Sequence, residues 1–171
     1  MRNSESNTPA ECFNVQLKKH LLSVTLYLLP LFLSAQSTLP AYSLVYDPAR
    51  DPFVDGRAAL KLARETNRRV LIEVGGDWCR WCHVLNKFLA ENPQTRERLH
   101  RNFVILKVNV SEANDNAEFM AGFPKPLGYP HIYITEADGR IIFSKDTAEL
   151  LENSRYSVQR FQQFIDKWKL P

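Results

Sequence analysis

Two cysteines separated by two residues, Cys79 and Cys82, follow an apolar run and precede a helical pattern. The run "RVLIEVGG", residues 69–76, is short, continuous and closed by two glycines, which predicts a buried strand. After the cysteines, apolar residues keep helical spacing until Asn92 and Pro93 end the pattern. The sequence therefore predicts a strand, a tight turn and a helix, with both thiols where the helix begins.

Periodicity and turn signals predict further elements along the chain. They are a helix over residues 56–66 with Asp55 as its N-cap, a strand over 103–110, a hairpin around "ADG" (137–139) and an amphipathic helix over 158–168. Strands that alternate with helices are typical of an α/β protein, in which helices cover the faces of a sheet.

The composition fits a single globular domain. The chain has 171 residues and a formal net charge of +3, and its 44% hydrophobic content argues against a disordered chain. Residues 38–54 are rich in proline and aspartate and are predicted to form an irregular lead-in, followed by the domain over residues 55–171. Because the charge is mild and no basic cluster lies in the domain, nucleic acid is not an expected partner.

An uncharged apolar stretch lies near the N-terminus. The stretch covers residues 21–35; Lys18 and Lys19 precede it, and small residues follow it. This order predicts a secretory signal peptide over residues 1–37, and therefore a periplasmic or otherwise exported protein. The alternative is an uncleaved membrane anchor, although the stretch is shorter than the about 20 residues that a spanning helix needs.

Cleavage of this segment would change the cysteine inventory. Cys12 would be removed with the signal peptide, so the mature chain would keep Cys79 and Cys82 alone. A single CxxC pair forms no disulfide framework. The fold must then be stabilised by its own core, and the pair is available for chemistry.

Three segments in this order resemble the thioredoxin superfamily. "VLIEVGGDWCRWC" is similar to the family's strand, loop and WCxxC segment, "GYPHIYI" from Gly128 to its cis-proline segment, and "DGR" from Asp138 to the hairpin after it. More narrowly, "EVGGDWCRWCH" resembles exported single-domain thioredoxin-like proteins with a WCxWCH signature. The resemblance, from about Asp55 to Leu170, implies a thioredoxin fold, with a central mixed β-sheet flanked by helices.

The resemblance also implies a redox dithiol. Cys79 would lie at a helix N-terminus, where unpaired N–H groups favour the thiolate, and Cys82 would resolve the mixed disulfide that Cys79 forms. The same geometry predicts an exposed Cys79 and a shielded Cys82. Arg80 and His83 would add positive charge beside the thiolate.

Two aromatic side chains flank the predicted dithiol. Trp78 and Trp81 would offer flat apolar surface to a partner peptide, and for Trp78 the alternative is a packing role in the core.

Four other residues take positions that matter in the family. Glu73 falls where thioredoxins have a buried carboxylate, a group that as a rule has a raised pKa and can transfer a proton to the resolving cysteine. Lys107 falls where the family has a lysine that pairs with that carboxylate; the alternative is that the two form only a structural ion pair. Pro130 would be the cis-proline, and Tyr129 before it would contact the substrate backbone.

Two other chemistries use the same residues. Cys79 to His83 satisfies C-x-x-C-H, the attachment signature of c-type haem. Cys79, Cys82, His83 and His131 are also a candidate zinc set, although their spacing is less regular than that of typical zinc sites. A strand with paired glycines before the motif and "GYP" after it has no role in a haem protein, so neither a cofactor nor a metal is predicted.

The predicted function is that of an exported thiol–disulfide oxidoreductase, with protein thiols and disulfides as partners. A reductant fed by a membrane electron donor is favoured over an oxidant, because the chain has no room for the extra domains of the periplasmic oxidant and isomerases. A monomer is expected. The alternative from another class is a thioredoxin-fold binding module whose dithiol is idle.

Overall fold

The computed structural model describes residues 39–171, all within one compact unit, Ser37–Pro171. The predicted signal peptide lies outside the described residues. The elements are η1 (Ala41–Ser43), α1 (Pro52–Glu65), β1 (Arg69–Gly75), α2 (Arg80–Glu91), α3 (Pro93–Asn102), β2 (Phe103–Asn109), α4 (Ala117–Met120), β3 (His131–Thr135), β4 (Ile141–Asp146), η2 (Thr147–Leu150), β5 (Leu151–Glu152), β6 (Arg155–Tyr156) and α5 (Val158–Trp168).

Four strands form one mixed sheet in the order β2-β1-β3-β4. β1 and β2 are parallel, whereas β3 is antiparallel to both β1 and β4. The predicted α/β class and the thioredoxin fold are confirmed. The central position of β1 matters for the site, because the chain leaves the middle of the sheet and enters α2 directly.

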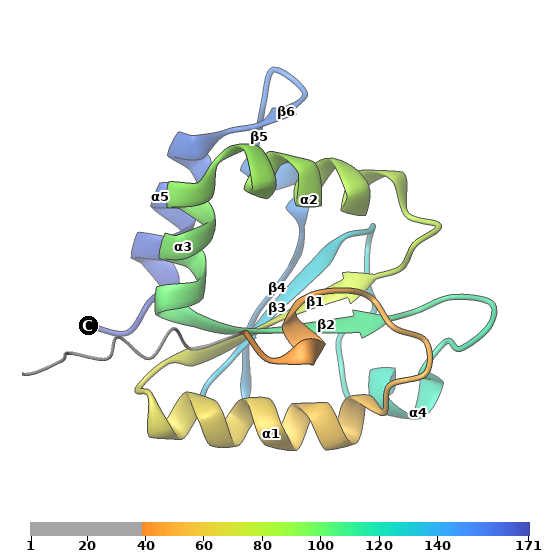
Figure 1. Ribbon diagram of the computed structural model, residues 1–171. Helices are drawn as coiled ribbons and strands as arrows, with labels where there is room; N and C mark the ends of the chain where they lie inside the picture. Colours follow the sequence, from red (N-terminus) through yellow and green to blue (C-terminus); the bar gives the residue numbers. More distant parts are fainter. Residues whose placement is uncertain (1–38) are drawn as a thin grey trace, which may run out of the picture. The chain divides into compact units, whose positions relative to one another are not determined.

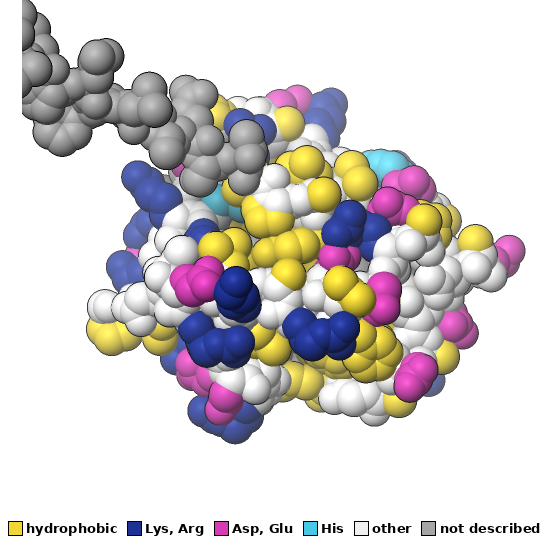
Figure 2. Space-filling model, turned by 60° about the horizontal axis from the view of Figure 1, so that its bottom comes forward, with side chains coloured by type: hydrophobic (Ala, Val, Ile, Leu, Met, Phe, Trp, Pro, Cys, Tyr) yellow, Lys and Arg dark blue, Asp and Glu magenta, His cyan; other side chains and the backbone are white. Residues whose placement is uncertain are grey.

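Helices cover both faces of the sheet (Figure 1). Alternate strand residues point to opposite faces, so β1 sends Leu71 into one core and Val70 and Ile72 into another. The first core lies under α2, α3 and α5, and the second under α1. Figure 2 shows the α1 side, where Lys and Arg side chains mix with Asp and Glu and hydrophobic side chains lie between them.

Helix α1 begins four residues earlier than the sequence predicted. Its N-cap is Asp51, whose carboxylate accepts hydrogen bonds from the N–H groups of Phe53 and Val54, and Pro52 occupies the first helical position. Asp55, the predicted N-cap, lies inside the helix and pairs with Arg50 at 2.5 Å. Proline is well tolerated at the first position because its missing N–H would have no helical partner there.

The Asn92-Pro93 signal ended α2 as predicted, but a new helix, α3, begins at the proline. The short strands β5 and β6 and the short helix α4 were also not predicted. Within residues 39–171, no helix is both long and apolar enough to span a membrane.

Candidate active site

Cys79 and Cys82 are joined by a disulfide at the start of α2. Cys79 is the N-cap residue, and its sulfur accepts a hydrogen bond of 3.1 Å from the N–H of Cys82. Cys79 therefore occupies the helix N-terminus that the sequence predicted. A thiolate at this position would gain the same hydrogen bond and the favourable end of the helix dipole.

Both cysteines are buried. Cys79 is 3% exposed and Cys82 1%, so the expectation that Cys79 is exposed is wrong for this oxidised state. The cause is a cluster of aromatic side chains, since Tyr46 and Tyr129 pack against the two sulfur-bearing residues. The two tyrosines therefore restrict access to the cysteine pair.

Two glycines let β1 approach the disulfide closely. A Cβ on Gly75 would lie 2.5 Å from the sulfur of Cys82 and 3.0 Å from the ring of Tyr46. A Cβ on Gly76 would lie 2.6 Å from the indole nitrogen of Trp78. Contacts under 3.0 Å do not occur for real Cβ atoms, so glycine is required at both positions unless neighbouring groups move.

A buried polar cluster lies beside Cys82. Glu73 and Lys107 are adjacent partners in the parallel β1–β2 register, and Lys107 Nζ lies 3.4 Å from Glu73 Oε1. Lys107 Nζ also donates to Asn86 Oδ1 at 2.6 Å, and Tyr46 donates its hydroxyl hydrogen to the same oxygen of Glu73. The expected Glu73–Lys107 ion pair is therefore present, with a third partner that the sequence did not predict.

Tyr46 is that missed residue. It lies in the predicted irregular lead-in, where no periodicity indicated which side chains are buried. Burial and the neighbouring Glu73 raise the pKa of Tyr46 well above its ordinary value, so its hydroxyl stays protonated.

Two exposed tryptophans flank the disulfide. Trp78 is 58% exposed and Trp81 42%, so the core role considered for Trp78 is wrong. The indole N–H of Trp78 donates to the Val110 carbonyl at 2.6 Å, and its ring meets Tyr129 edge to face at 5.3 Å. Trp81 meets Tyr156 in the same way at 6.1 Å. Both indoles therefore expose apolar surface from residues next to the redox pair in the chain.

The predicted charged neighbours lie at the surface. Arg80 is exposed, and within residues 39–171 it forms no side-chain hydrogen bond or ion pair. His83 is also exposed, and its Nε2 lies 2.7 Å from the carbonyl oxygen of Asp77, on the loop that precedes Cys79.

The β1–β3 register places the Tyr129–Pro130 segment at the end of β1. His131 pairs with Val74. Pro130 comes just before His131 in the chain, so in this antiparallel pairing it lies one position beyond that pair, beside the end of β1. The Tyr129–Pro130 peptide bond is cis. His131 itself is buried, its Nε2 lies 3.0 Å from Ser144 Oγ, and burial lowers its pKa.

The structure does not gather the candidate zinc set. Cys79 and Cys82 are bonded to each other, and their sulfurs are therefore not free for a metal or for haem attachment in this state. His83 and His131 have the separate partners given above. Among residues 39–171, no group of three or more His, Cys, Asp or Glu side chains is arranged to hold a metal ion.

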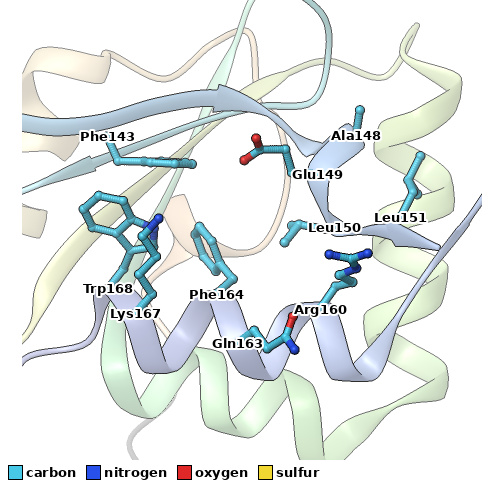
Figure 3. Close-up of a pocket in the computed structure, with 10 residues that line it drawn as sticks. All are labelled: Phe143, Ala148, Glu149, Leu150, Leu151, Arg160, Gln163, Phe164, Lys167 and Trp168. Atoms are coloured by element: carbon cyan, nitrogen blue, oxygen red, sulfur yellow. The ribbon is translucent and has the colours of Figure 1, made fainter.

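A separate pocket of about 460 Å³ lies between β4, η2 and α5 (Figure 3). Phe143, Phe164 and Trp168 form its apolar wall, and Glu149 and Arg160 contribute charged groups. It contains none of the site residues predicted from the sequence.

The fold and the site together define a class. A disulfide between the two cysteines of a CxxC motif, at the N-terminus of the helix that follows the central strand, is the arrangement of a thiol–disulfide oxidoreductase of thioredoxin fold. The family model described as Thioredox_DsbH, a protein of unknown function (DUF255), matches residues 47–169. The chain belongs to this family.

One solved structure agrees with this class at the level of fold, and one relative matches part of the sequence. The chain is similar to the crystal structure of a disulphide isomerase from Xylella fastidiosa Temecula1, with a TM-score of 0.61 and 26% identity, over 76% of this chain and 96% of that one. It is 38% identical over 60 residues to the uncharacterized protein B0495.5 of Caenorhabditis elegans, which is 35% of this chain and 8% of that protein.

A human protein shows a similar partial match. Spermatogenesis-associated protein 20 of Homo sapiens is 31% identical over 70 residues, or 41% of this chain and 9% of that protein. The matches therefore span less than a tenth of the length of these two relatives.

Proposed function

We propose that the protein is an exported thiol–disulfide oxidoreductase that reduces disulfides in partner proteins through Cys79 and Cys82. The observation that carries the proposal is the position of Cys79, whose sulfur is the N-cap of α2 and accepts the N–H of Cys82. The similarity to a structure described as a disulphide isomerase supports protein disulfides as the substrate class.

The chemistry requires two exchange steps. The Cys79 thiolate attacks one sulfur of a partner disulfide, the partner S–S bond breaks, and one partner thiolate leaves and takes up a proton. Cys82 then gives its proton to the Glu73 carboxylate and attacks the Cys79 sulfur. The second partner thiolate is released, so the partner gains two electrons and the two cysteines form the disulfide.

The direction of electron flow is part of this proposal. Within residues 39–171, the connection between β2 and β3 carries only the short helix α4 and no inserted helical domain. This simple architecture supports a thioredoxin-like reductant over an oxidant. A reductant needs a donor that restores the dithiol, and we assign that role to a membrane dithiol protein, with this chain acting as a monomer.

Export rests on the apolar segment over residues 21–35, which lies outside the described residues. Mass spectrometry of the protein from the periplasm tests it: cleavage predicts an N-terminus within a few residues of Thr38. An N-terminus that is still uncleaved would indicate a membrane anchor, and a mass increment with red colour would indicate attached haem.

Reduction of insulin by dithiothreitol tests the activity. The purified protein should accelerate precipitation of the insulin chains, and Cys79→Ser should abolish the acceleration. Lys87→Gln, on the exposed side of α2, is the matched control and should leave the rate unchanged.

One observation favours the alternative of a binding module. The disulfide is almost completely covered, as an idle pair would be. A wild-type protein that leaves the insulin rate unchanged would support this alternative.

A redox potential measured against glutathione decides the direction of electron flow in an active protein, because a reductant lies near thioredoxin at about −270 mV and an oxidant near about −120 mV.

A further inference from the structure

Tyr46 is a buried polar side chain at the site that the exchange steps above do not use. It comes from the segment before α1, yet it packs against Cys79 and Cys82. Its hydroxyl donates to Glu73 Oε1, the oxygen that also faces Lys107. The ammonium group of Lys107 lies 4.8 Å from the centre of the Tyr46 ring, so the tyrosine contacts both members of the ion pair.

The hydroxyl and the sulfur of Cys82 face the same point. A Cβ on Gly75 would lie 2.5 Å from the Cys82 sulfur and 3.0 Å from the Tyr46 hydroxyl oxygen. Because Gly75 has no side chain, nothing from β1 separates the two groups at that point. The Tyr46–Glu73 hydrogen bond is therefore made next to the sulfur that has to lose a proton.

We propose that Tyr46 is a positioning residue, which holds the Glu73 carboxylate in place so that it accepts the proton of Cys82. The inference rests on the proposed function, and it deepens the role of the same site. Loss of the hydroxyl would leave the Glu73 carboxylate without this hydrogen bond and free to turn away from the Cys82 sulfur.

A route from the cluster to water exists at Lys107. Lys107 and Asn86 both line an open pocket of about 1150 Å³ between η1, α2 and α3. A proton that reaches Glu73 can therefore leave on the side away from the disulfide. Two more titratable groups interact electrostatically with Glu73, namely Tyr156 from β6 and His100 from α3. Both are unchanged in the variants described next.

The experiment separates formation of a mixed disulfide from its resolution. Reduced protein is mixed with excess oxidised glutathione, the reaction is quenched at intervals between pH 5 and 9, and mass spectrometry counts the glutathione adduct. Tyr46→Phe keeps the ring and removes the hydroxyl. Adduct formation at Cys79 should be unchanged. Resolution by Cys82 should slow about tenfold, the size expected for one hydrogen bond to a charged group.

Two matched variants make the result specific. Tyr42→Phe alters another buried tyrosine of the same segment, one that lies in the α1-side core, and should leave both rates unchanged. Glu73→Gln should itself slow resolution, and adding Tyr46→Phe in that background should then change nothing further.

Three outcomes would overturn the inference. Unchanged resolution in Tyr46→Phe would do so, as would unchanged resolution in Glu73→Gln, or an equal effect of Tyr46→Phe with and without Glu73. These results differ from failure of the proposed function itself, in which the wild-type protein would form no adduct at any pH and the role of Tyr46 would fall with it.

Discussion

At the residue scale, the sulfur of Cys79 occupies a position that stabilises a negative charge. It accepts one backbone N–H within the site and lies at the positive end of α2. Both effects stabilise a thiolate over a thiol, and stabilising the reduced form makes the disulfide a stronger oxidant. The neighbouring cation, Arg80, acts in the same direction, although its side chain is exposed.

Replacing Arg80 measures this contribution. Arg80→Gln should make the protein more reducing by about 10 to 30 mV, since 30 mV corresponds to about one pKa unit at the thiol and exposure weakens the effect. Equilibration with glutathione gives the potential, and Lys87→Gln, a loss of charge farther along α2, serves as control. A potential that stays constant, or rises, would show that Arg80 does not tune the thiol.

At the element scale, the contact of β1 with the first turn of α2 determines the geometry of the site. Gly75 is the last residue of β1, and any side chain there would overlap Cys82 and Tyr46. Its role is close approach, and Gly76, which follows it, meets the same requirement against the side chain of Trp78.

Gly75→Ala tests that requirement. Overpacking against the Cys82 sulfur should lower the free energy of unfolding by about 1 to 3 kcal/mol, as measured in urea. Gly56→Ala is the matched control, because a Cβ in the middle of α1 would meet only ordinary contacts at 3.7 Å or more. The control should gain up to about 1 kcal/mol, the helix preference for alanine. Equal effects of the two variants would contradict the close approach at Gly75.

Elements with strong periodicity could be predicted from the sequence, and those determined by tertiary contacts could not. The four strands of the main sheet and α5 follow directly from apolar patterns. Helix α3 has few apolar residues, and its buried residues are Thr95 and Leu99, so no pattern indicated it. The start of α1 was missed because Asp55 was expected to be the N-cap, whereas Asp51 caps the helix by accepting from the N–H groups of Phe53 and Val54, which follow it.

The candidate site shows the same division. Glu73 and Lys107 could be placed through the resemblance, because they lie on regular strands in register. Tyr46 lies in an irregular segment, and its burial depends on how that segment crosses the sheet. The cover over Cys79 was missed for the same reason, since Tyr46 and Tyr129 come from distant parts of the chain.

At the scale of the whole molecule, a buried histidine beside the site makes the stability of the fold depend on pH. His131 is buried beside the end of β1, and burial lowers its pKa, an effect that the nearby Asp146 partly opposes. In the unfolded chain the same imidazole takes up a proton near pH 6.5. The unfolded state therefore binds more protons below that pH, and stability falls as the pH decreases from about 6.5 toward the lower folded-state pKa.

Urea unfolding between pH 7.5 and 5 measures this dependence. His131→Gln should flatten the loss of stability below pH 6.5, whatever its effect at neutral pH. His83→Gln alters an exposed histidine and should leave the slope as in the wild type. Identical slopes in all three proteins would show that His131 is not the titrating group.

The central claim is that Cys79 attacks the partner and Cys82 resolves, and trapping of mixed disulfides tests it most directly. Cys82→Ser and Cys79→Ser are each expressed in the periplasm, and disulfide-linked partners are separated on non-reducing gels and identified by mass spectrometry. Cys82→Ser should retain covalent partners that dithiothreitol releases, because its Cys79 can attack but no thiol resolves the product. Cys79→Ser should retain none. Equal trapping by the two variants, or trapping by Cys79→Ser alone, would contradict the account.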